Sequence, residues 1–146
     1  MNSNWPRWIY ASASKVFNTV AVAYPLHLFL EGTKRGTDVK TNYLEFRMDG
    51  PKVTEVSHGY FKLEINLSVL FSLAIGADFH LPQRVIGKLV EAMDNICVYE
   101  YGDGDAYLGT LQCETTDVMN FGQARPDTEI IQGVVAGSFT IYLEES

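Results

Sequence analysis

The sequence predicts an α+β fold: a mostly antiparallel sheet with two helices packed on one face and a long central strand. The main observation is residues 60–75, YFKLEINLSVLFSLAI, where every second side chain is apolar. Successive side chains of a strand point to opposite faces, so this run lays one apolar row against a core over roughly 50 Å. In addition, two segments have helical spacing, and the strand-like segments outnumber them and mostly follow one another through turns.

The length and composition fit one globular domain over residues 1–146. With 47% hydrophobic and 20% charged residues, the chain can build a core and is unlike disordered sequences. Its formal net charge is −7, whereas a phosphate-binding face needs clustered Lys and Arg. We therefore expect no specific binding of nucleic acid.

A first helix is predicted over residues 5–23, with a proline in its first turn and another just beyond its end. Apolar residues recur there at three- and four-residue steps: Trp5, Ile9, Ala13, Val16, Phe17 and Val20. Alternating leucines predict a short strand over residues 26–30. Residues 32–41, GTKRGTDVKT, are predicted to form a polar, flexible contact loop with three cationic side chains, Lys34, Arg35 and Lys40.

Residues 43–48 alternate and predict the next strand. Asp49-Gly50-Pro51 follows and is a strong turn signal. We expect this turn to join the strand to residues 60–75 as an antiparallel hairpin. Residues 52–57 would extend the long strand, with a bulge or bend at His58-Gly59.

A second helix is predicted over residues 82–93, PQRVIGKLVEAM, from its apolar stripe. Residues 96–101 and 107–114 alternate about a turn at 101–105 and predict a hairpin. Residues 115–128 contain Gly122 and Pro126 and are predicted to be a second mobile loop. Residues 130–144 form the last strand.

The sequence carries no catalytic or metal-binding signature. The three histidines lie far apart, outside any HExxH or CxxC setting. Asp103 and Asp105 in GDGD lack the further oxygen ligands of a calcium loop and are explained by a tight turn. No GxSxG, GxxxxGK[ST] or GxGxxG motif in a suitable context is present. We therefore expect neither enzymatic activity nor a cofactor or metal.

The two cysteines, Cys97 and Cys113, are too few for a disulfide framework. In the second hairpin Cys97 faces Thr110, so both are expected to be reduced thiols of a cytosolic protein, with a Cys97–Cys113 bridge as the alternative. The apolar residues within 16–30 are interrupted by Asn18, Pro25 and His27. They predict neither a membrane span nor a signal peptide.

The far end of the long strand is apolar or uncharged on its outer side as well, at Leu70, Ser72 and Ala74. This surface is expected to be covered. One interpretation is burial under the chain's own helix or loop, and the other is an interface with a neighbouring subunit.

The order and size of these elements resemble the tail terminator and head-to-tail joining (neck) proteins of long-tailed bacteriophages. The resemblance covers most of the chain: an N-terminal helix, a short strand of the PLHLFLEG type and a polar loop come first. The long strand GYFKLEINLSVLFSL, the helix PQRVIGKLVEAM and the last strand GSFTIYLEE follow. The segment between the second helix and the last strand is longer than in a minimal member.

The resemblance implies a homo-oligomeric ring, a hexamer, at the head-proximal end of the tail. It would contact the tail tube protein and the connector or neck proteins, while DNA passes through without specific binding. The protein would be assembled in the host cytoplasm and reside in the virion. Its axial contact loops would carry Lys34, Arg35, Lys40, Met119, Asn120 and Phe121. The alternative function is a small-ligand-binding α+β protein of the cytosol, with the ligand between sheet and helices.

Overall fold

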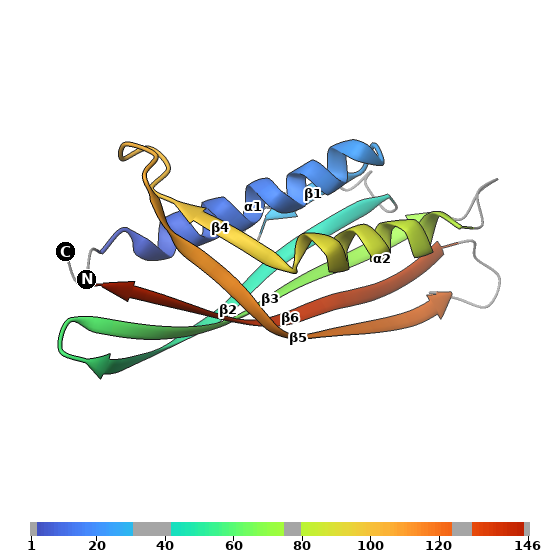
Figure 1. Ribbon diagram of the computed structural model, residues 1–146. Helices are drawn as coiled ribbons and strands as arrows, with labels where there is room; N and C mark the ends of the chain where they lie inside the picture. Colours follow the sequence, from blue (N-terminus) through green and yellow to red (C-terminus); the bar gives the residue numbers. More distant parts are fainter. Residues whose placement is uncertain (1–2, 31–41, 75–79, 124–129, 145–146) are drawn as a thin grey trace.

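The computed structural model describes residues 3–30, 42–74, 80–123 and 130–144. The elements are α1 (Trp5–Ala23), β1 (His27–Leu30), β2 (Tyr43–Ser57), β3 (Tyr60–Ala74), α2 (Leu81–Ala92), β4 (Asn95–Tyr99), β5 (Tyr107–Gln123) and β6 (Ile130–Glu144). The strands form one six-stranded sheet in the order β1-β2-β3-β6-β5-β4 (Figure 1). β1 pairs with β2 in parallel, and the other neighbouring pairs are antiparallel.

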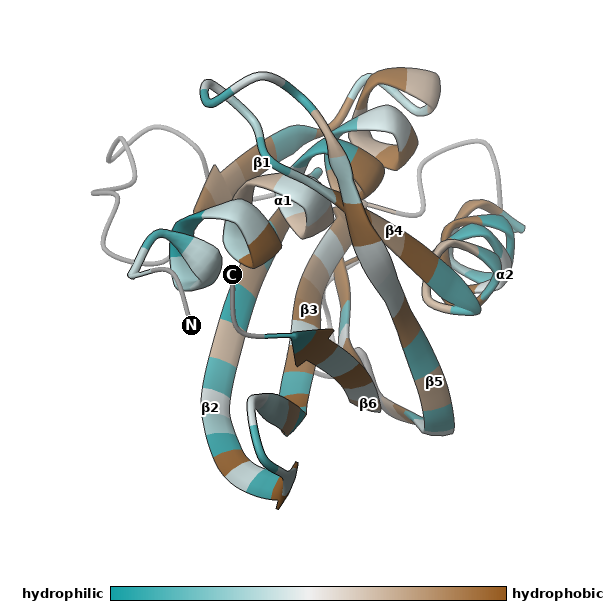
Figure 2. Ribbon diagram, turned by 60° about the vertical axis from the view of Figure 1, so that its left-hand side comes forward, coloured by the Kyte–Doolittle hydropathy of each residue, from teal (hydrophilic) through white to brown (hydrophobic). Residues whose placement is uncertain are grey.

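The predicted fold class was wrong. The molecule is mostly sheet, and this sheet is mixed through its β1–β2 pair and curls into a half-barrel, in place of the predicted sheet with two helices packed on one face. A flat sheet of six strands, about 4.8 Å apart, would separate its outer strands by roughly 24 Å, about twice a helix diameter. Yet α1 contacts β1 and β2 at one side of the sheet and β4 at the other. The sheet therefore bends around α1 (Figure 2).

The parallel pairing of β1 with β2 also departs from the prediction. The alternation of apolar residues identifies both segments as strands, but it does not tell whether two neighbouring strands run parallel or antiparallel. Residues 31–42 connect them, and a parallel connection needs about a dozen residues or more. The connection is thus long enough to bring the chain back to the start of β1, where His27 lies opposite Tyr43.

The predicted hairpin turn at Asp49-Gly50-Pro51 was wrong as well. The strand continues through it to Ser57, with a register shift between Asp49 and Lys52 and a φ of +99° at Gly50. Such a bulge increases the twist of a strand. The chain reverses instead at His58-Gly59, so β2 is far longer than predicted.

The long central strand is confirmed. β3 pairs with β6 along its whole length and with β2 on its other side. Its inward side chains are almost fully buried: Leu63, Ile65, Leu67, Val69, Phe71 and Leu73. Helix α1 lies over this core, and α2 contacts α1, β6 and β3. Ile75, the last residue of the predicted strand, lies outside the described residues.

A hydroxyl of α1 closes the outer edge of β4. Ser12 is 2% exposed, and its Oγ accepts a hydrogen bond from the backbone N–H of Tyr99 at 3.1 Å. The same hydroxyl donates to the carbonyl oxygen of Trp8 at 2.8 Å. A backbone donor at the sheet edge therefore finds its partner on the helix.

Replacing Ser12 with alanine is expected to lower the free energy of unfolding by about 2 kcal/mol, because the Tyr99 N–H loses its acceptor. Urea denaturation measures the change. The matched control is Ser14→Ala, whose hydroxyl donates to the Tyr10 carbonyl on the same helix. That variant is expected to stay within about 0.5 kcal/mol of wild type. Equal losses in the two variants would refute the role of Ser12.

The β4–β5 hairpin has the predicted register, with Cys97 opposite Thr110. Both cysteines are free thiols. The turn of this hairpin holds α1: Trp8 Nε1 donates to Asp103 Oδ2 at 2.8 Å, and Arg7 forms an ion pair with the same carboxylate. In addition to its place in the turn, Asp103 thus anchors the helix.

Candidate functional site

The predicted axial contact residues divide into two groups. Lys34, Arg35 and Lys40 lie outside the described residues. Met119, Asn120 and Phe121 lie in β5 and not in a loop, so the prediction of a loop from residue 115 was wrong. The pairing of β5 with β6 continues to Gln123: the register shifts between Asn120 and Gly122 without ending the strand, and Gly122 itself pairs with Gln132. Met119 is 51% exposed, opposite Val134.

The three residues predicted to form a subunit interface lie on β3 beside β6, and they differ in exposure. Leu70, Ser72 and Ala74 face Val134, Gln132 and Ile130 on β6. Ser72 is only 1% exposed, and its Oγ accepts a hydrogen bond from Gln132 Nε2 at 3.4 Å. Leu70 and Ala74 are half-buried. Ser72 therefore has almost no solvent-exposed surface that a partner could contact, whereas the side chain of Leu70 is partly exposed.

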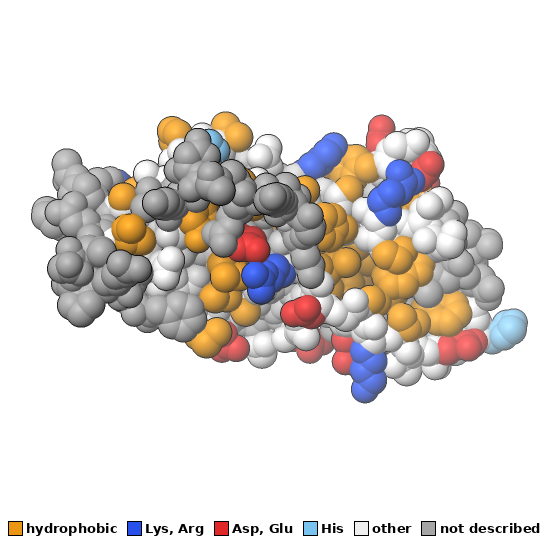
Figure 3. All heavy atoms as spheres, turned by 180° about the vertical axis from the view of Figure 1, so that it is seen from behind, with side chains coloured by type: hydrophobic (Ala, Val, Ile, Leu, Met, Phe, Trp, Pro, Cys, Tyr) orange, Lys and Arg blue, Asp and Glu red, His pale blue; other side chains and the backbone are white. Residues whose placement is uncertain are grey.

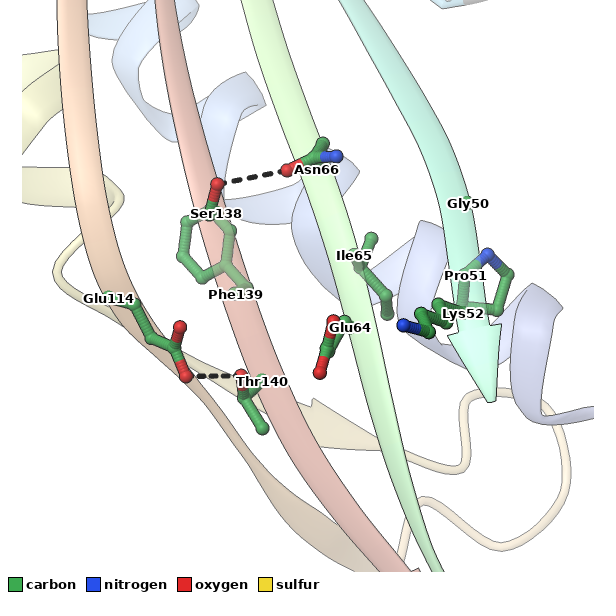
Figure 4. Close-up of a pocket in the computed structure, with 10 residues that line it drawn as sticks. All are labelled: Gly50, Pro51, Lys52, Glu64, Ile65, Asn66, Glu114, Ser138, Phe139 and Thr140. Carbon is green, nitrogen blue, oxygen red and sulfur yellow. Dashed lines mark hydrogen bonds between the residues drawn. The ribbon is translucent and has the colours of Figure 1, made fainter. Parts of the chain in front are cut away.

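A polar hollow of about 490 Å³ lies on the outer face of the sheet and spans β2, β3, β6 and β5 (Figure 4). It is lined by Gly50, Pro51, Lys52, Glu64, Ile65, Asn66, Glu114, Ser138, Phe139 and Thr140. Its polar groups bond one another: Ser138 Oγ donates to Asn66 Oδ1 at 3.0 Å, and Thr140 Oγ1 donates to Glu114 Oε1 at 2.7 Å. The bulge in β2 forms one wall.

Beside this hollow, Lys62 forms an ion pair with Glu64 at 3.3 Å. The hydrogen bond to Glu64, and then its negative charge, raise the pKa of Lys62 above the usual value. Because the pKa of Lys62 is raised in the folded state, its pairing with Glu64 stabilises the fold at neutral pH. This stabilisation is lost as the pH rises through the folded-state pKa. Both side chains are well exposed, so solvent screening keeps the contribution small.

The hollow offers carboxylates, hydroxyls, an amide and the ammonium group of Lys52, but no histidine or cysteine. Within the described residues, no group of three or more His, Cys, Asp or Glu side chains is placed to hold a metal ion. The arrangement can bind water or a polar side chain through these groups.

The surface that the sequence reading missed is the end of the β2–β3 hairpin. We call residues 52–62 the arm. In Figures 1 and 2 the hairpin reaches away from the helices, and residues 52–58 are all exposed. Val53 and Val56 are 44% and 49% exposed. The view from behind shows hydrophobic side chains gathered on the half where the arm lies, among charges of both signs (Figure 3).

A second surface feature lies between the helices. A groove of about 370 Å³ is lined by Val16, Thr19, Val20, Ala23, Lys88, Glu91 and Ala92. Its floor is mainly apolar, and its rim on α2 carries an ion pair between Lys88 and Glu91 at 3.4 Å. The part of the chain that the structure describes contains no helix long and apolar enough to span a membrane.

Comparison with known proteins gives a likeness of fold and no family. No protein-family model matches the chain, and no curated protein matches it. A solved structure that carries no functional name is similar over 97% of this chain and 96% of its own, with a TM-score of 0.54 and 19% sequence identity. At this identity the likeness shows the fold alone.

Proposed function

We propose that this chain is a virion structural protein of a long-tailed bacteriophage, namely a tail terminator or neck protein. Its copies form a ring, a hexamer by the family resemblance, at the head-proximal end of the tail. The ring joins the tail tube protein to the connector or neck proteins. The protein is assembled in the host cytoplasm and resides in the virion.

The observation that carries the proposal is the arm. It extends the sheet past the helices and exposes two valines, Val53 and Val56, next to charged residues. Exposed apolar side chains on a projecting hairpin are typical of a surface that a partner covers. A structural ring needs such contacts between copies and needs no chemistry.

Two further properties support the proposal. The chain contains the helices and strands on which the family resemblance rests: an N-terminal helix, a short strand, the long strand β3, a second helix and a last long strand. The net charge of −7 suits a ring through which DNA passes without being held.

The test is the mass of the purified chain in solution together with electron-microscope images. Multi-angle light scattering at high protein concentration is expected to give six times the 16.3 kDa mass of one chain. Negative-stain images are expected to show rings. A chain that stays monomeric at high concentration and in extracts of assembled particles would refute the proposal.

A further inference from the structure

We propose that the ring closes by insertion of the arm of one copy into the groove between α1 and α2 of the next copy. This inference rests on the proposed function, and it names the two surfaces that meet. The partner of the groove is a second copy of this chain.

The arm supplies the inserted side chains. Val53 pairs in register with Leu63, which is fully buried, so Val53 extends the inward apolar row of the sheet past the end of the core. Val56 stands at the register shift between Glu55 and Ser57, where the strand is bent. Both valines are about half exposed, so their burial by a partner would remove apolar surface from water.

The groove supplies the receiving surface. Val16, Val20 and Ala23 of α1 and Ala92 of α2 form its apolar lining. Its volume of about 370 Å³ lies in the range of about 300–1,000 Å³ found for sites that enclose small ligands. That space accommodates a pair of aliphatic side chains from a strand better than a whole secondary-structure element.

The charges beside the two apolar surfaces are complementary. On the arm, Lys52 and Glu55 flank Val53 and Val56 along the strand. On the groove, Lys88 and Glu91 stand on the α2 rim, and both are largely exposed. Lys88 and Glu91 pair with each other at 3.4 Å, and in the contact this exposed pair opens, so that Lys52 meets Glu91 and Glu55 meets Lys88. Each copy carries both the arm and the groove, so a second copy provides the partner of each surface.

The arm and the groove lie on different parts of one molecule, at the hairpin end and between the helices (Figure 1). A contact between two different surfaces of identical chains is heterologous, and it forms a closed ring when the rotation between copies permits. A two-fold contact of arm with arm would instead give a dimer. The geometry therefore fits the ring expected of this protein.

The first test replaces Val56 with aspartate. Val56 is exposed, so the variant is expected to fold with an unchanged circular dichroism spectrum and to lose the ring in light scattering. The matched control is Val118→Asp, a similarly exposed valine on β5 that lies outside the arm and the groove and should leave assembly unchanged. A ring that persists in Val56→Asp would overturn the inference and leave the proposed function standing.

The second test locates the contact by cysteine cross-linking in a background with Cys97→Ser and Cys113→Ser. One batch of chain carries Val56→Cys and the other carries Thr19→Cys, at the groove. After mixing and oxidation with diamide, a disulfide is expected between the two batches and in neither batch alone. A disulfide formed by Val56→Cys with itself would show an arm-to-arm contact and overturn the inference. A wild-type chain without rings would overturn the proposed function as well.

Discussion

Replacing Gly133 with alanine is expected to lower the free energy of unfolding by about 3 kcal/mol. Gly133 lies in β6, between Phe71 on β3 and Asn120 on β5. A Cβ atom at this position would lie 2.5 Å from the carbonyl oxygen of Met119 and 2.9 Å from Cε1 of Phe71. The carbonyl belongs to the neighbouring strand and the ring to the packed core, so neither can move away cheaply.

Urea denaturation of Gly133→Ala gives the size of this loss, and Gly87→Ala is its control. A Cβ at Gly87 meets no heavy atom within 4 Å, and the position is exposed in α2. Because alanine favours a helix by up to about 1 kcal/mol over glycine, that variant is expected to be more stable than wild type. Gly133→Ala combined with Phe71→Leu should recover part of the loss. A wild-type unfolding free energy in Gly133→Ala would show that β6 shifts without cost.

The sequence was sufficient for those elements whose side-chain periodicity is unbroken. The three- and four-residue steps predicted α1 with its bounds, and the alternation of residues 60–75 predicted β3 as the central strand. Periodicity states which side chains share a face. It gives neither the direction of a neighbouring strand nor the curvature of the sheet. The parallel β1–β2 pair and the half-barrel therefore escaped prediction.

Glycine and proline caused the remaining errors. Asp49-Gly50-Pro51 was interpreted as a turn and the segment that contains Gly122 as a loop, whereas the structure holds both inside long strands, each next to a shift of register. Local sequence does not distinguish a turn from a bulge, because both use the same residues, and pairing with a neighbouring strand decides between them. The arm was missed for this reason. A usable signal was present in residues 52–57, where two valines and a threonine favour a strand that continues to the turn at Gly59.

Replacing Phe46 with alanine is expected to have the largest effect, a loss of about 4 kcal/mol in the free energy of unfolding. Phe46 is fully buried on β2, and its ring centroid lies 5.0 Å from that of Tyr10 and 5.1 Å from that of Phe17, both on α1. The side chain fills the space between α1 and the concave face of the curled sheet. Its removal leaves a cavity and breaks both aromatic contacts.

Two further variants of β2 distinguish the loss of Phe46 packing from the effect that any substitution in this strand has on stability. Phe46→Leu keeps an apolar side chain at the same place and is expected to lose less than half as much stability as Phe46→Ala. Val53→Ala lies on the exposed arm of the same strand and is expected to stay within about 0.5 kcal/mol of wild type. Urea denaturation gives the three free energies of unfolding, and near-ultraviolet circular dichroism reports the packing of the aromatic side chains as a group. If Phe46→Ala lowered the free energy of unfolding no more than Val53→Ala, this side chain would not hold α1 against the concave face of the sheet. The curl of the sheet around it would then need another cause.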